Sequence, residues 1–211
     1  MKFRKFYMVF AALLGWFGLF LQLFLTLNNR ESGVGFWGRF FNFFSFFTIL
    51  TNILAATSLT CSVFFSRVGI GRFMTKPAVQ TSIAMYILIV GIVYISLLQG
   101  LWKPEGWQLV ADLILHYAVP VLYPIYWFMF VNKGTTKWSN CISWLSYPGV
   151  YFAYSLARGS VTNWYPYPFI DVSENGLNRT LFNAAILLCG FVVTGLIFIS
   201  LDKFFARTTD R

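Results

Sequence analysis

The chain has 211 residues, of which 58% are hydrophobic, 21% aromatic and only 11% charged, with a net charge of +9 and a mean hydropathy of +0.66. So few charged side chains would give a water-soluble domain too little polar surface, so the composition excludes a soluble enzyme or binding module and predicts an integral membrane protein. The basic residues are spread over separate short segments, which excludes a basic domain that binds nucleic acid. We expect one all-helical membrane domain over residues 1–211.

Six apolar segments predict six membrane-spanning helices, because about 20 residues of helix cross a hydrocarbon core of about 30 Å. In chain order they cover approximately residues 6–27, 41–65, 78–99, 107–130, 141–157 and 181–201. Lys2, Arg4 and Lys5 precede the first segment, as the basic residues of a secretory signal would. That segment is too long for a signal peptide and lacks a clear small-x-small cleavage site, so we expect a membrane anchor.

The basic residues also predict the orientation, since Lys and Arg near helix ends favour the cytoplasmic side of a membrane. With the N-terminus inside, the cytoplasmic segments hold eleven of the sixteen basic residues: Lys2, Arg4, Lys5, Arg67, Arg72, Lys76, Lys133, Lys137, Lys203, Arg207 and Arg211. The outer segments hold Arg30, Arg39, Lys103, Arg158 and Arg179, together with four of the seven acidic residues. We therefore expect both termini in the cytoplasm and an attraction of the inner segments to anionic lipid.

The second segment carries a polar stripe in the sequence "FNFFSFFTILTNILAATS". Asn42, Ser45, Thr48 and Asn52 follow one another at spacings of three and four, and Thr51 borders this stripe. Stripes of small and hydroxylated residues commonly serve close packing between membrane helices, and Thr often bonds to its own helix backbone. The alternative is a polar face that lines a site.

The fourth segment contains the only histidine of the chain, in "ADLILHYAVPVLYP". Asp112 and His116 are four residues apart, so a helix places both on one face and lets the carboxylate approach an imidazole nitrogen and fix the tautomer of the ring. Pro120 lacks an N–H and predicts a bend that leaves the carbonyl of His116 without its helical donor. Two interpretations remain open: a histidine that serves a cavity, or a structural histidine beside a packing kink.

Counting residues from the outer end of each segment places the two polar faces at one depth. Thr51 lies ten residues past Phe41, and His116 lies nine residues past Trp107. At 1.5 Å per residue, both are about 13 to 15 Å below the outer surface. A hydroxyl and a potential base therefore share a layer, although the sequence does not say whether the two helices face each other.

This layer predicts a nucleophile and base pair, with Asp112 as the group that orients the base and Asn52 or Thr48 as an oxyanion donor. An alternative function uses the same residues, with Asp112, His116 and Arg158 as a proton-linked or anion-binding site of a transporter or lipid-binding protein. A transporter needs access from both sides, and the polar residues identified here are concentrated in the outer half. That distribution favours an enzyme.

The fifth segment adds Tyr154 and Arg158, again four residues apart and close to the outer side. Arg158 could bind a carboxylate or a lipid headgroup, or could simply extend its charged end into the membrane interface. The loop that follows, residues 159–179, contains Pro166, Pro168 and several aromatic residues. It predicts either a lid over the membrane surface or an aromatic anchor at the headgroups.

These motifs carry a resemblance to a known family. A six-helix chain with "ILTN", "HYAVP" and "RG" followed by "WYPYPFID" resembles the bacterial relatives of the androgen-induced membrane threonine hydrolases. The resemblance covers nearly the whole chain in helix order, and its few sharp motifs lie mostly between Ala111 and Asp171. The animal members of that family hydrolyse fatty acid esters of hydroxy fatty acids with an intramembrane threonine and a histidine.

The resemblance implies Thr51 as nucleophile, with Thr48 as a rival, and His116 as base. Ser45 is a further supporting residue, and Tyr154 and Tyr123 join Arg158 as candidates for substrate contact. The expected substrate is a fatty acyl ester that enters from the bilayer, at a site toward the outer half of a bacterial inner membrane. We expect no cofactor and no metal, and the scattered residues Cys61, Cys141 and Cys189 predict neither a zinc site nor a disulfide framework.

Overall fold

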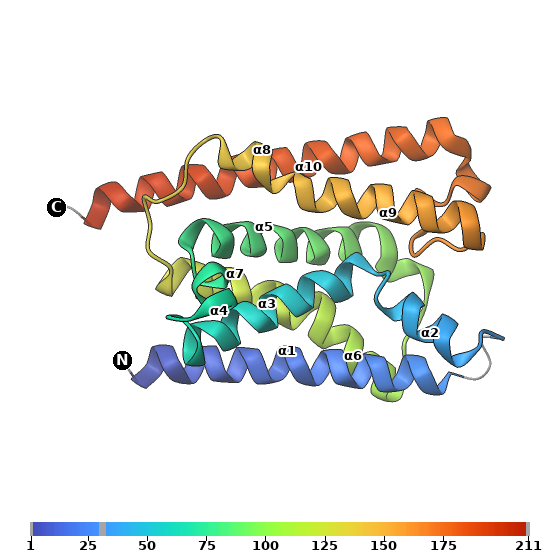
Figure 1. Ribbon diagram of the computed structural model, residues 1–211, viewed down its shortest axis with the longest axis horizontal. Helices are drawn as coiled ribbons and strands as arrows, with labels where there is room; N and C mark the ends of the chain where they lie inside the picture. Colours follow the sequence, from blue (N-terminus) through green and yellow to red (C-terminus); the bar gives the residue numbers. More distant parts are fainter. Residues whose placement is uncertain (1, 30–32, 210–211) are drawn as a thin grey trace. The chain divides into compact units, whose positions relative to one another are not determined.

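The computed structural model describes residues 2–29 and 33–209, and every regular element in these ranges is a helix (Figure 1). Arg30, Glu31 and Arg211, which the charge pattern assigns to outer and inner segments, lie outside the described residues. The chain divides into two compact units, residues 1–135 and 136–211, and each is described by itself.

The first unit contains α1 (Lys2–Asn28), α2 (Phe36–Phe43), α3 (Phe47–Phe64), α4 (Gly69–Met74), α5 (Pro77–Val93), α6 (Gly106–Leu113) and α7 (Val119–Phe130). A π-helical turn, η2 (Tyr94–Leu98), and a 3₁₀ turn, η3 (Gln99–Leu101), extend α5, and a second π-helical turn, η4 (Ile114–Ala118), joins α6 to α7. The second unit contains α8 (Asn140–Trp144), α9 (Ser146–Thr162), the 3₁₀ turn η5 (Pro168–Ile170) and α10 (Val172–Thr209).

Five helical stretches of the described chain are long and apolar enough to cross a membrane: Lys2–Asn28, Phe47–Phe64, Pro77–Leu101, Gly106–Phe130 and Val172–Ala206. The segment expected over residues 141–157 is not among them, because two shorter helices, α8 and α9, meet there at Leu145. Pro148 lies in the first turn of α9, a position where a residue without an N–H is tolerated, so the sequence favours a new helix start there.

The helix expected over residues 41–65 begins only at Phe47, and this corrects the depth estimate. Phe41 belongs to the separate helix α2, and the chain turns between the two helices, where the Ser45 hydroxyl donates to the carbonyl of Phe41 at 2.7 Å. Phe46 has an extended backbone and precedes α3. Thr51 therefore lies only four residues past the start of α3, so a count from Phe41 does not measure its depth.

Small residues bring the helices of the first unit close together. The helix α1 packs along α3, and α5 lies against both α3 and α7 (Figure 1). A Cβ on Gly18 would lie 2.5 Å from Cγ2 of Ile114, so α1 and η4 approach too closely for a side chain there. This is the packing that small residues permit between membrane helices. The core beside it contains Leu19, Phe43, Ile49, Ala56 and Leu115.

One face of α1 carries large apolar side chains that no other part of the described chain covers. Their exposed fractions lie between 49% and 68%, and they recur every three or four residues: Phe3, Phe6, Phe10, Leu13, Phe17, Phe20 and Phe24. A helix of a water-soluble protein would turn such a face to the core. The exposed stripe therefore supports an integral membrane protein.

The second unit is held together by contacts of α10 with α8, α9 and η5. The buried carboxylate of Asp202 accepts hydrogen bonds from the backbone N–H and the hydroxyl of Thr136, at 3.0 and 2.7 Å. The side chains of Asn175 and Asn183 donate to the carbonyls of Pro168 and Phe169, at 2.6 and 2.9 Å. Both ends of the unit, including the proline-rich loop, are thus tied to α10.

Candidate functional site

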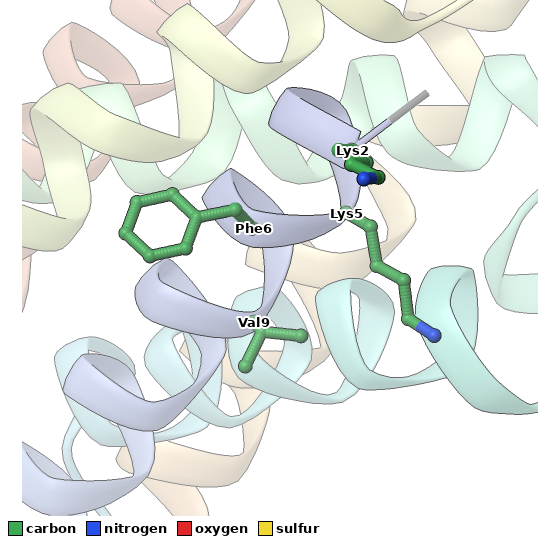
Figure 2. Close-up of a pocket in the computed structure, with 4 residues that line it drawn as sticks. All are labelled: Lys2, Lys5, Phe6 and Val9. Carbon is green, nitrogen blue, oxygen red and sulfur yellow. The ribbon is translucent and has the colours of Figure 1, made fainter.

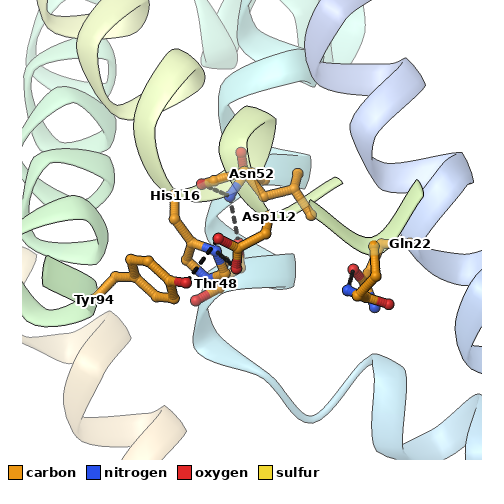
Figure 3. A network of polar contacts seen from close by, with 8 residues as sticks. Gln22, Thr48, Asn52, Tyr94, Asp112 and His116 are labelled. Atoms are coloured by element: carbon orange, nitrogen blue, oxygen red, sulfur yellow. Dashed lines mark hydrogen bonds and ion pairs between the residues drawn. The ribbon is translucent and has the colours of Figure 1, made fainter. Parts of the chain in front are cut away.

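Asp112 and His116 meet as the four-residue spacing predicts. Nδ1 of His116 lies 3.0 Å from Oδ1 of Asp112 (Figure 3). The Asp112 side chain is only 3% exposed, whereas that of His116 is 15% exposed. The carboxylate is therefore enclosed by the helices, and the imidazole keeps one edge accessible.

Tyr94 completes this pair, and no motif or spacing in the sequence indicates it. Its hydroxyl donates to Oδ2 of Asp112 at 2.7 Å, so both carboxylate oxygens accept a hydrogen bond. Its ring stacks on the imidazole of His116, with centroids 3.9 Å apart and planes 14° from parallel. Tyr94 belongs to another helix, and no local spacing predicts which residue of a neighbouring helix will lie over the histidine.

Both aromatic residues of the stack lie in π-helical turns. The N–H of Val119 donates to the carbonyl of Ile114, and the N–H of Gln99 donates to the carbonyl of Tyr94, each one residue beyond the α-helical pattern. The bend predicted at Pro120 therefore takes the form of a π turn immediately before the proline. Such turns occur frequently at functional sites, where they redirect side chains.

A glycine sets the distance between the two helices at this point. A Cβ on Gly91 would lie 3.0 Å from Cβ of Pro120 and 3.4 Å from the carbonyl oxygen of His116. Carbon atoms in contact prefer about 3.5 to 4.0 Å, so only glycine fits without displacement. Because Tyr94 follows Gly91 by three residues, this crossing positions its ring over His116.

Asn52 joins α3 to the segment that carries the histidine. Its side-chain amide donates to the carbonyl of Thr48 at 2.8 Å and to the carbonyl of Leu115 at 3.1 Å (Figure 3). Both amide hydrogens are therefore engaged, and in this geometry Asn52 does not offer the oxyanion donor that the sequence predicts. Its buried Oδ1 has no hydrogen-bond partner among the described residues.

The two candidate nucleophiles are both buried on α3. Thr48 precedes Asn52 by four residues and shares its face, which is the face directed at η4. Thr51 is the immediate neighbour of Asn52 and lies about 100° around the helix from it. Figure 3 draws Thr48 in the same group of polar side chains as Asn52, His116 and Asp112. Ser45 lies in the turn before α3, with its hydroxyl bonded to the backbone.

Tyr123 does not lie in this group. It belongs to a second buried set of polar side chains, which we call the α4-end network: Ser58, Ser62, Gln80, Tyr123 and Tyr126. The Tyr123 hydroxyl donates to Ser58 at 2.7 Å, and Ser58 donates to the carbonyl of Met74 in α4 at 3.2 Å. Buried polar side chains therefore occur toward both ends of the first unit, since α2 and α4 lie at its opposite ends (Figure 1), and which end faces the outer side of the membrane stays a prediction.

Arg158 and Tyr154 belong to α9 in the second unit. The guanidinium of Arg158 lies over the ring of Trp164, 4.5 Å from its centroid. Tyr154 is exposed. This places Arg158 beside the aromatic residues of the loop that follows α9, and its part in substrate binding stays a prediction.

An open hollow of about 440 Å³ lies elsewhere, on the first turns of α1. Its lining residues are Lys2, Lys5, Phe6 and Val9 (Figure 2). Two ammonium groups beside apolar side chains at the end of a membrane-spanning helix suit an anionic headgroup with its acyl chains. None of the candidate catalytic residues contributes to this hollow.

No family model, curated protein or solved structure matches this chain. Within the described ranges, no group of three or more His, Cys, Asp or Glu side chains is arranged to hold a metal ion. The function is therefore inferred from the geometry around His116 and from the sequence motifs.

Proposed function

We propose that the protein is an intramembrane lipid-ester hydrolase, in which a threonine hydroxyl of α3 is the nucleophile and His116 is the base. The observation that carries this proposal is the contact of Nδ1 with the buried carboxylate of Asp112. A carboxylate at that position keeps the ring proton on Nδ1 and leaves Nε2 as an acceptor for a hydroxyl proton. Nε2 has no hydrogen-bond partner among the described residues.

The reaction proceeds in two halves. The threonine oxygen attacks the ester carbonyl while its proton passes to Nε2 of His116, and the tetrahedral oxyanion then expels the alcohol, which takes that proton. Water attacks the acyl-threonine in the second half, again giving a proton to Nε2, and the fatty acid leaves as the threonine is reprotonated. The family resemblance favours Thr51 as the nucleophile, whereas the shared face with Asn52 favours Thr48.

The substrate class follows from the membrane and from Arg158. A fatty acyl ester partitions into the bilayer, and a planar guanidinium fits the free carboxylate of a fatty acid ester of a hydroxy fatty acid. Arg158 and Tyr154 are candidates for that contact from the sequence alone, since both belong to the second unit and His116 belongs to the first. The hydroxyl of Tyr123 is committed to the α4-end network, so contact of Tyr123 with the substrate stays a prediction from the sequence.

We further propose six membrane crossings within one membrane domain, both termini in the cytoplasm, and a site toward the outer half of a bacterial inner membrane. The sixth crossing is supplied by α9, whose 17 residues span about 26 Å, with α8 extending it. This length is at the short limit for a spanning helix. The distribution of basic residues supports the orientation.

A transporter or lipid-binding protein is the second candidate, and the α4-end network favours it, because that network places polar groups toward the opposite end of the first unit. Its described members are hydroxyl and amide groups that bond one another or the backbone, with the guanidinium of Arg4 beside Tyr126 and without a carboxylate or imidazole. Such a network stabilises helix packing, and it supplies no second ionisable site for proton coupling. The hydrolase therefore remains the preferred function.

The test is a fluorophosphonate probe for hydrolase nucleophiles, applied to the purified protein, with mass spectrometry to identify the labelled residue. Thr51→Ala, Thr48→Ala and His116→Ala are compared with Thr57→Ala, a matched control on the same helix. Labelling at Thr51 or Thr48, lost in that residue's variant and in His116→Ala, supports the proposal. Ester hydrolysis and labelling that survive in all of these variants would exclude it.

A further inference from the structure

We propose that Tyr94 is a positioning residue that holds the only histidine of the chain as a single tautomer, with the proton on Nδ1. Tyr94 acts through Asp112 and through the stack on the ring. The tautomer is a property of the folded protein whether or not it hydrolyses esters, and only the kinetic consequence rests on the proposed function.

The hydrogen bond from Tyr94 fixes the direction of the carboxylate. Asp112 is enclosed, and its two oxygens accept from Tyr94 and from Nδ1 of His116, at 2.7 and 3.0 Å. Without the Tyr94 hydroxyl, Oδ2 would be a buried acceptor with no donor, a state that proteins avoid. The carboxylate would then be free to rotate, and Oδ1 would no longer be held against Nδ1 of His116.

The stack fixes the direction of the imidazole itself. The two rings are nearly parallel at a centroid distance of 3.9 Å, so the ring of His116 cannot rotate about its Cβ–Cγ bond without displacing Tyr94. Rotation by half a turn would exchange Nδ1 with Cδ2 and Nε2 with Cε1, so a C–H group would replace Nδ1 beside Asp112. The backbone also holds Tyr94 in place, because the close contact of Gly91 with Pro120 and the His116 carbonyl, one turn earlier, fixes where the two helices cross.

The two contacts predict separable effects. Tyr94→Phe keeps the ring and the stack and removes only the donor to Oδ2. Tyr94→Leu removes both. Tyr117→Phe is the matched control, since Tyr117 packs edge-on against Tyr94 at 5.6 Å and its hydroxyl makes no hydrogen bond to the described residues.

The experiment is solid-state ¹⁵N NMR of the protein in lipid bilayers, labelled only at histidine nitrogens and carrying a tag without histidine. Because the chain has one histidine, the spectrum reports His116 alone. At alkaline pH, where an imidazole is neutral, the nitrogen that carries the proton resonates well upfield of the other. The wild type and Tyr117→Phe should show one tautomer, protonated at Nδ1, and Tyr94→Phe and Tyr94→Leu should show a mixture.

The kinetics of ester hydrolysis by the same variants provide a second measurement beside the NMR spectrum. Tyr94→Phe should lower kcat about tenfold, with KM changed less than twofold, because a positioning residue acts on the base and does not touch the substrate. A wild-type spectrum with the proton on Nε2, or a Tyr94→Phe spectrum identical to wild type, overturns the inference. A single Nδ1 tautomer in a protein that hydrolyses no ester leaves the inference standing and removes the proposed function instead.

Discussion

Gly91→Ala should disable the candidate site while leaving most of the stability of the protein intact. The residue lies where α5 crosses η4, directly before the π turn that begins with Tyr94. An added Cβ would lie 3.0 Å from Cβ of Pro120 and 3.4 Å from the carbonyl oxygen of His116. Carbon atoms in contact prefer about 3.5 to 4.0 Å, so the two helices must part by about 0.5 to 1 Å.

The cost in stability is small because two effects oppose each other. Overpacking of a core by one methyl group costs about 1 to 3 kcal/mol. Alanine in place of a helical glycine regains about 0.5 to 1 kcal/mol through the lower conformational entropy of the unfolded chain. The free energy of unfolding should therefore fall by at most about 2.5 kcal/mol.

The effect on the site is larger, because a displacement of about 1 Å at a catalytic group costs about a hundredfold in rate. We expect fluorophosphonate labelling of Gly91→Ala to slow by about that factor while its thermal unfolding midpoint falls by at most about 10 °C. Gly190→Ala is the control, since an added Cβ there meets no atom within 4 Å. Labelling of Gly91→Ala at the wild-type rate would refute the argument that this crossing positions the stack.

Three further substitutions test other parts of the molecule. Asp112→Asn should slow labelling at least about a hundredfold, since it removes the charge that keeps the proton on Nδ1, and an unchanged rate would contradict that role. Thr136→Val should lower the free energy of unfolding by about 1 to 2 kcal/mol without slowing labelling, because Asp202 loses one buried hydrogen bond; an unchanged midpoint in thermal unfolding would show that this bond stabilises nothing. Lys2→Gln with Lys5→Gln should reduce the extra stability that phosphatidylglycerol gives over phosphatidylcholine by about 1 kcal/mol per charge, and equal stabilisation of variant and wild type would exclude the headgroup contact.

The sequence predicts the helical class and the Asp112–His116 pair because both depend on local spacing. Apolar runs of sufficient length indicate membrane-spanning helices. Side chains four residues apart lie next to each other on a helix, whatever that helix packs against. Pro120 likewise predicts a distortion beside His116. The form of this distortion, a π turn, depends on which backbone carbonyls remain without a donor once the neighbouring helices have packed. No rule based on local sequence predicts that.

The turn before α3 and the role of Tyr94 were not predictable in the same way. Hydropathy is continuous across "FFNFFSFF", so a window of about 20 residues joins α2 to α3 and hides the turn at Ser45. Tyr94 reaches Asp112 from another helix, and the closeness of the two helices depends on Gly91. Contacts of this kind require the packing of whole helices, which a single sequence does not contain.

The two hydrogen bonds of the Asn52 amide also restrict how α3 and η4 can move against each other. The two amide hydrogens bind carbonyls on different helices, Thr48 of α3 at 2.8 Å and Leu115 of η4 at 3.1 Å. A slide of one helix along the other by a single residue, about 1.5 Å, would break the second bond and leave buried polar groups without partners. A carrier whose alternating access moved α3 along η4 would break these hydrogen bonds in every cycle, whereas ester hydrolysis does not require that movement.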